Sequence, residues 1–155
     1  MWERLRRFKN LPAPARALFL RAAALLPLVA LRLRIQGFQV TKNSLQGFPG
    51  RLSFASLGSN ETAKRTALTA RMVRAAAKYG FGSPSCLEES LVLMYLLRRQ
   101  GIGSQLRIGV KKNIPKFEAH AWVECDGVAL NESEALHDHY APFEVEFSLT
   151  PPGQS

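Results

Sequence analysis

The chain has 155 residues, 46% of them hydrophobic, which is enough for one packed domain and too apolar for a disordered protein. Its net charge of +9 favours acidic partners, but no RNA-binding signature accompanies the Lys and Arg residues, so we do not expect nucleic acid binding. Two cysteines without a C-x-x-C motif argue against a disulfide scaffold and a structural zinc site, and they fit a reducing cytoplasm.

We expect one domain overall, with an apolar helical segment and a connecting loop (1–60) packed on a core (61–155). Residues 15–26 predict a helix that Pro27 breaks or kinks, and a second piece, 28–36, ends at Gly37. Four arginines interrupt this apolar stretch, so we do not expect a membrane span.

The simplest interpretation of this segment is a helical layer that covers the core. Two alternatives remain open: a docking surface for a hydrophobic peptide or protein, and peripheral contact of residues 1–36 with a membrane surface. Residues 38–60 lose the helical pattern and are rich in Gly, Ser and Asn, which predicts a connecting loop. Residues 61–78 regain helical spacing with one basic face.

The central element of the predicted fold is a helix that begins at Cys86. Ser85 and Glu88 form a capping box, and Gly101 is a C-terminal stop signal. Residues 91–97 are apolar on all sides, which is typical of a buried helix. The free amides and the dipole at a helix N-terminus favour an anion, so Cys86 is a candidate nucleophile.

After Gly101 the hydrophobic period changes from that of a helix to that of a strand. Residues 106–110 and 118–125 predict two strands, a turn follows at Asp126-Gly127, and residues 128–130 predict a third strand. The predicted fold class is α+β, with a helical N-terminal half and a central buried helix carrying Cys86 packed on a small antiparallel sheet.

Alternation along the second strand divides its side chains between two faces. His120, Trp122 and Glu124 share one face, and Cys125 lies on the other with small apolar residues. We therefore expect Cys125 to be a buried core thiol. Cys86 is then the thiol that His120 can deprotonate, and the imidazole can later protonate a leaving amine.

Glu132 is the candidate for the group that orients His120, and the hairpin register decides whether it can. With a two-residue loop, Ala121 falls opposite Glu132, which then points away from His120. With a three-residue loop containing a bulge, His120 falls opposite Glu132. A Cys-His-Glu triad therefore predicts the three-residue loop, and Asn131 or Asp126 is the fallback.

The sequence gives little support for a metal site or a phosphate-binding site. The run His137-Asp138-His139 contains metal-binding residue types, but no further spaced ligands accompany it, and we expect no metal site. There is no phosphate-binding glycine loop, and we expect no cofactor.

Together these motifs resemble the transglutaminase-like cysteine peptidase superfamily, and within it the stand-alone leader peptidases of bacterial lasso peptide biosynthesis. The resemblance is carried by Ser85-Cys86-Leu87 at the helix start, by residues 96–102 and 106–110, by Ala119-His120-Ala121-Trp122-Val123-Glu124, by Asp126-Gly127, and by Asn131-Glu132. It implies a transglutaminase/papain-like core and a catalytic triad of Cys86, His120 and Glu132, where such enzymes commonly have Asp as the third member.

The activity that the resemblance implies is removal of the leader peptide from a ribosomally synthesised precursor, a step of RiPP maturation. The implied partners are the precursor leader, a separate leader-recognition protein (RiPP recognition element) and a lactam-forming synthetase. No recognition domain is evident in the residues before Cys86, which favours the split arrangement. Two alternatives remain: acyl or amide transfer by the same triad, and a non-catalytic peptide-binding partner in which Cys86 is merely buried.

Overall fold

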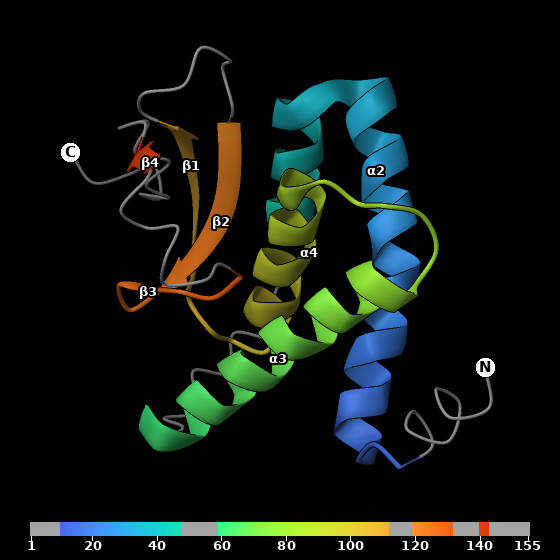
Figure 1. Ribbon diagram of the computed structural model, residues 1–155, viewed down its shortest axis with the longest axis vertical. Coiled ribbons are helices and arrows are strands. Elements are labelled where there is room, and N and C mark those ends of the chain that lie inside the picture. Colours follow the sequence, from blue (N-terminus) through green and yellow to red (C-terminus); the bar gives the residue numbers. More distant parts are fainter. Residues whose placement is uncertain (1–9, 48–58, 112–118, 132–139, 143–155) are drawn as a thin grey trace.

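A computed structural model describes residues 10–47, 59–111, 119–131 and 140–142 (Figure 1). Its elements in chain order are α2 (Ala13–Gly47), α3 (Ser59–Tyr79), α4 (Cys86–Arg99), β1 (Gln105–Lys111), β2 (Ala119–Cys125), β3 (Val128–Ala129) and β4 (Tyr140–Pro142). The protein is α+β, as the sequence predicts, with the helices preceding the strands.

The helix α4 lies between the sheet and the long helix α2, and α3 crosses both, near the C-terminal end of α4 and partway along α2 (Figure 1). The side chains of Leu91, Leu93 and Leu97 are fully buried at 0% exposure. They form one core with Val29 of α2, Val73 of α3 and apolar residues of β2. The all-round apolar character of α4 therefore reflects packing on several sides at once.

The helix α2 departs from the sequence-based prediction at two places. Pro27 lies inside the helix and does not break it; the kink is at Gly37, which has φ 76° and ψ 177°. Only glycine adopts this left-handed φ readily, so the change of direction falls there. Packing holds the helix together across Pro27, because Leu26 and Val29 on either side of it are both in the core.

The predicted loop over residues 38–60 is also wrong in its first part, because the chain resumes a helix after Gly37 and continues to Gly47. The hydroxyl of Thr41 donates to the carbonyl of Gly37 at 2.8 Å, and Leu45 is buried in the core. Tertiary burial of these residues outweighs a local sequence that carries no clear helical pattern.

The predicted boundaries of α4 are confirmed. The amide of Glu88 donates to Ser85 Oγ at 3.3 Å, and the amide of Ser85 donates to Glu88 Oε2 at 2.8 Å, which completes the capping box. Just past the other end, Gly101 has φ 74°, the left-handed conformation that ends many helices.

The sheet is antiparallel, with strand order β3-β2-β1-β4. Asp126 and Gly127 alone form the β2–β3 turn, with φ 50° and 79°, and Cys125 pairs with Val128. Two positive φ values are those of a type I′ turn, whose twist matches that of the strands. This is the two-residue register, so the three-residue loop that the triad argument required is wrong.

The strand β4 was not predicted. It pairs with β1 through three residues, Tyr140–Pro142, at an edge of the sheet. A segment this short has no alternation long enough to recognise, and a proline inside it argues locally against a strand.

Candidate active site

Cys86 is the first residue of α4 and is half-buried. Its side chain packs partly against the core while the helix end remains beside solvent-accessible Ser85. The capping box fixes where the helix starts and therefore which amides remain unpaired around the thiol. Unpaired amides at a helix start can donate hydrogen bonds to a negatively charged group bound there.

His120 lies on β2, on the face of the sheet that the alternation predicts. Its ring stacks on that of Trp122, with centroids 6.2 Å apart and planes at 17°. The indole N–H donates to Glu124 Oε1 at 3.1 Å, and Arg107 of β1 pairs with Glu124 Oε2 at 2.9 Å. The ion pair of Arg107 and Glu124 thus fixes the indole of Trp122. The stacked indole in turn restricts one side of the His120 imidazole.

Three hydrogen bonds link α4, β2 and the residue Asn131 that follows the hairpin. The hydroxyl of Ser90 donates to the carbonyl of Ala121 at 3.0 Å, and Asn131 Nδ2 donates to Ser90 Oγ at 2.9 Å. Asn131 Oδ1 accepts from the amide of Val123 at 2.8 Å. Ser90 is 0% exposed, so these bonds satisfy polar groups that water cannot reach.

This network places Cys86 and His120 at the same end of the α4–β2 pair. Ser90 follows Cys86 by about one helical turn, and its partner Ala121 is the residue after His120. At the opposite end, the thiol of Cys125 donates to the carbonyl of Gly103 at 3.3 Å, just beyond the end of α4. The helix and the strand therefore run in the same direction, with Cys86 and His120 at their starts.

The hydrogen bond of Ser90 reaches β2 from the side of β3. The amide and carbonyl of Val123 both point toward that side, because they bond Asn131 and Leu130. By alternation the carbonyl of Ala121 points to the same side, beyond the last residue of β3. The body of α4 packs on the face of β2 that carries Ala121, Val123 and Cys125, whereas His120 alternates to the opposite face.

The third member of the predicted triad, Glu132, lies outside the described residues. In a continued two-residue register it would fall opposite Ala121, but β3 ends at Ala129, and the Asn131 side chain takes the place of a strand partner for Val123. The hairpin register therefore no longer supports a pairing of Glu132 with His120.

The two alternative orienting residues, Asp126 and Asn131, lie at different distances from His120. Asp126 is wrong as the orienting group, because it lies six residues from His120 along β2, about 20 Å away. Asn131 lies at the correct end of the strand, but both its amide groups already bond other residues, Val123 and Ser90. Its observed role is to join α4 to β2.

Cys125 is the buried thiol that the sequence predicts, at 8% exposure. Burial, and secondarily the nearby Asp126 carboxylate, raise the pKa of this thiol. Both effects oppose formation of a thiolate, so Cys125 is chemically unsuited to nucleophilic attack.

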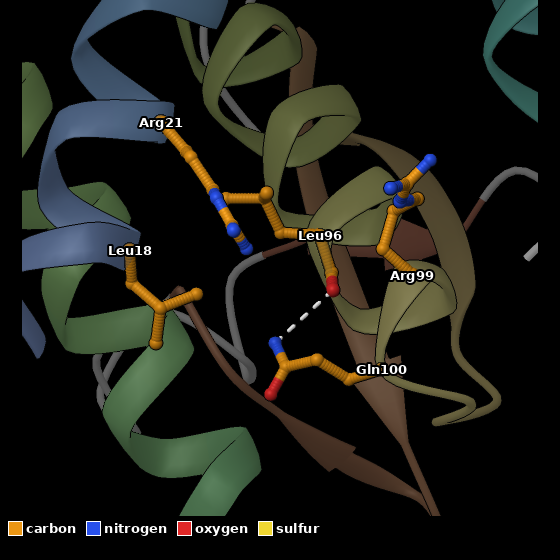
Figure 2. A pocket seen from close by; sticks show the side chains of 5 residues that line it. All are labelled: Leu18, Arg21, Leu96, Arg99 and Gln100. Carbon is orange, nitrogen blue, oxygen red and sulfur yellow. Dashed lines mark hydrogen bonds between the residues drawn. The ribbon is translucent and has the colours of Figure 1, made fainter. Parts of the chain in front are cut away.

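A hollow of about 310 Å³ lies between α2 and the last turn of α4 (Figure 2). It is lined by Leu18, Arg21, Leu96, Arg99 and Gln100, and Gln100 Nε2 donates to the carbonyl of Leu96 at 3.1 Å. Cys86 is at the other end of the same helix, about 20 Å away. This hollow is therefore separate from the candidate active site.

The described residues contain no group of three or more His, Cys, Asp or Glu side chains that could hold a metal ion. The run His137-Asp138-His139 falls outside them.

Sequence reasoning missed the positioning role of Ser90 and the support that Trp122 and Glu124 give to His120. A signal existed for both. Ser90 is the one small polar residue directly before an apolar run, and His120, Trp122 and Glu124 share one strand face by alternation.

Comparison with known families identifies the class of protein. A family profile described as the transglutaminase-like superfamily matches residues 25–145, well over half of the chain. The chain therefore belongs to the transglutaminase-like superfamily, for which cysteine peptidase or acyl-transfer chemistry is typical. The matched region includes Cys86 and His120 and begins within α2. Comparisons with curated proteins and with solved structures gave no match.

Proposed function

We propose that this protein is a cysteine peptidase that removes the leader from a lasso peptide precursor, with Cys86 as nucleophile and His120 as base. The observation that carries the proposal is the Ser90–Ala121 hydrogen bond, which holds the capped N-terminus of α4 at the end of β2 where His120 lies. Membership of the transglutaminase-like superfamily supports the choice of chemistry.

The proposed mechanism uses two covalent steps. His120 takes the proton from the Cys86 thiol, and the thiolate attacks the scissile carbonyl. His120 then protonates the departing amine as the C–N bond breaks, which leaves a thioester on Cys86. Water, activated by the same imidazole, hydrolyses the thioester to a carboxylate and restores the thiol. Backbone amides at the start of α4 are candidates to stabilise the oxyanion.

Glu132 is proposed to hold the imidazole in the tautomer that accepts the thiol proton. It directly follows Asn131, whose side chain is anchored at the edge of β2 beside Ala121. The proposed role of Glu132 rests on the resemblance to related enzymes and not on a regular hairpin register. Glu132→Gln is expected to lower the rate less than loss of either Cys86 or His120.

The proposed partners are a separate leader-recognition protein, which presents the precursor, and a lactam-forming synthetase, which consumes the released core peptide. The resemblance of the 85–132 region to stand-alone leader peptidases supports this split arrangement. In the described part of the chain, α2 and α3 both pack on α4, so their inward faces are already occupied.

The test is cleavage of a lasso precursor by the purified chain together with its recognition protein, followed by mass spectrometry. Cys86→Ala and His120→Ala should each abolish cleavage, with at most about 10⁻³ of the activity remaining. Cys125→Ala is the matched control, because it removes the other thiol and should retain activity. Cleavage by Cys86→Ala would disprove the proposal.

A second candidate is acyl transfer, because the superfamily covers both reactions. The same thioester forms, but an amine replaces water in the second step. Mass spectrometry of the products separates the two, since hydrolysis yields a free carboxylate and transfer yields an amine adduct.

A further inference from the structure

The helix α2 packs with one face on α3 and α4, and its opposite face is turned outward (Figure 1). That outward face carries an apolar stripe. On the inward face Ala22, Leu26 and Val29 are at most 3% exposed. The stripe residues recur every three or four positions on the other side: Ala17, Leu20, Ala24, Leu28, Leu31 and Ile35. Leu28 and Leu31 are each 53% exposed and Ile35 is 72% exposed.

The stripe extends for about 27 Å from Ala17 to Ile35. An ordinary surface helix would carry polar side chains on this face, so a continuous row of exposed leucine and isoleucine indicates a surface that meets another apolar phase.

Arginines border the stripe on both sides. At 100° per residue, Arg32 lies along one border, and Arg16 and Arg34 lie along the other. Arg21 starts from the same border as Arg32, but its side chain turns into the hollow beside α4 (Figure 2). No Asp or Glu occurs anywhere in α2. Arginine can lay its methylene stem along an apolar surface and place the guanidinium at its rim, so both borders present positive charge beside the stripe.

An exposed aromatic residue follows a turn that lies against α2. The turn after α3 passes over α2 (Figure 1), and a Cβ placed on Gly80 would lie 3.9 Å from Ala23 Cβ. The next residue, Phe81, is 87% exposed. Exposed aromatics beside a basic amphipathic helix are typical of helices that lie in a membrane interface.

We propose that α2 docks lengthwise on an anionic phospholipid surface, with its stripe at the acyl boundary and its arginines among the phosphates. A flat anionic surface complements both basic borders at once, whereas the rim of a protein partner usually mixes charges of both signs. No described helix is long and apolar enough to cross a membrane, so α2 lies on the bilayer and does not span it. This docking does not depend on the proposed peptidase activity.

Flotation of the full chain with lipid vesicles tests the docking. Binding is expected to vesicles of equal phosphatidylglycerol and phosphatidylcholine, and to be lost with phosphatidylcholine alone or in about 0.5 M NaCl. The pair Leu31→Ser and Ile35→Ser should lower the partition coefficient about tenfold or more, because two exposed apolar side chains no longer insert. Val128→Ser is the matched control, since Val128 is 63% exposed but lies on β3.

A second pair of variants tests whether binding requires the positive charges that border the stripe. Arg32→Gln with Arg34→Gln removes one cation from each border and should lower the partition coefficient about tenfold. Arg71→Gln with Lys64→Gln removes the same charge from exposed positions on α3 and should have a much smaller effect.

Several results would overturn the docking: no binding of the wild-type chain to anionic vesicles, equal binding to neutral vesicles, or unchanged binding by folded stripe variants. Light scattering provides a further test, because a wild-type dimer that the stripe variants make monomeric would show that a second copy covers this face. Circular dichroism checks that each variant is folded. If the stripe variants unfold, the test is the binding of the wild-type chain alone, which must require anionic lipid and be lost at high salt.

Discussion

Two short side chains, Ser90 and Asn131, connect the helix that carries the candidate nucleophile to the strand that carries the candidate base. Two bonds in this network, Ser90 with Ala121 and Asn131 with Ser90, join groups that are far apart in the chain. Because Ser90 is fully buried, water cannot replace a lost partner. The network therefore contributes both to stability and to the position of Cys86.

Ser90→Ala should destabilise the protein by about 1–3 kcal/mol, because it leaves the carbonyl of Ala121 and the amide of Asn131 without their partner. Cleavage by the folded variant should also fall, since the start of α4 is no longer held against β2. Urea denaturation and precursor cleavage measure the two effects.

Ser104→Ala is the matched control for this change. Ser104 Oγ is buried without a hydrogen-bond partner among the described residues, so its removal should leave stability unchanged or raise it. Equal losses in the two variants would show that the Ser90 network has no special role.

At the scale of elements, the capped start of α4 and the kink in α2 show two ways in which a helix boundary is set. The start of α4 is decided locally by the reciprocal bonds of Ser85 and Glu88. The change of direction in α2 falls at Gly37 and not at Pro27, because packing on both sides of Pro27 keeps the helix continuous.

Ser85→Ala should cost about 0.5–2 kcal/mol of stability, because the amide of Glu88 loses its acceptor. If the cap also positions Cys86, cleavage should fall in parallel. Ser85→Asp provides the rescue, since aspartate is an equally good N-cap and should restore both properties. Thermal unfolding and cleavage rates test this, and a rate unaffected by Ser85→Ala would separate the cap from catalysis.

For the whole molecule, the central position of α4 means that charged groups on its first turn are enclosed by neighbouring elements. Glu89 is half-buried, and loss of hydration raises the pKa of its carboxyl, while Arg74 of α3 acts in the opposite direction with smaller effect. A raised pKa means that the folded state holds its proton more tightly than the unfolded state does. Wild-type stability is therefore lost as pH rises from the ordinary pKa of about 4.5.

Glu89→Gln should remove this penalty. The variant should match the wild-type protein in stability near pH 4, and its advantage should grow toward pH 7. Urea denaturation at several pH values measures the difference. Glu61→Gln is the control, because Glu61 pairs with Arg65 at an exposed position and contributes little. Loss of stability in Glu89→Gln at pH 7 would mean that the contact with Arg74 outweighs burial.

Membrane docking is also a property of the whole molecule. The apolar character of residues 15–35 is visible in the sequence, but which of these side chains remain exposed depends on the packing of α2 against α3 and α4. The stripe is separate from the core because Ala22, Leu26 and Val29 turn inward while the stripe residues stay exposed.

Local signals in the sequence were sufficient to determine α3, α4, β1, β2 and the two faces of β2. The capping box, the all-apolar run and the strand alternation each depend on neighbours within a few residues, so no tertiary information is needed to interpret them. These signals made Cys86 and His120 candidates, and the burial that they predicted for Cys125 is confirmed.

Only the tertiary structure decided the continuation of α2 past Pro27 and Gly37, the presence of β4, the hairpin register and the Ser90–Asn131 network. Apart from the register, each of these depends on contacts between residues distant in the chain, and such contacts outweigh local preference by burying apolar surface or satisfying polar groups. The register depends on pairing over only a few residues. A turn at Asp126-Gly127 is evident from sequence, but two-residue and three-residue loops differ by small local energies, and pairing along β2 and β3 selects between them.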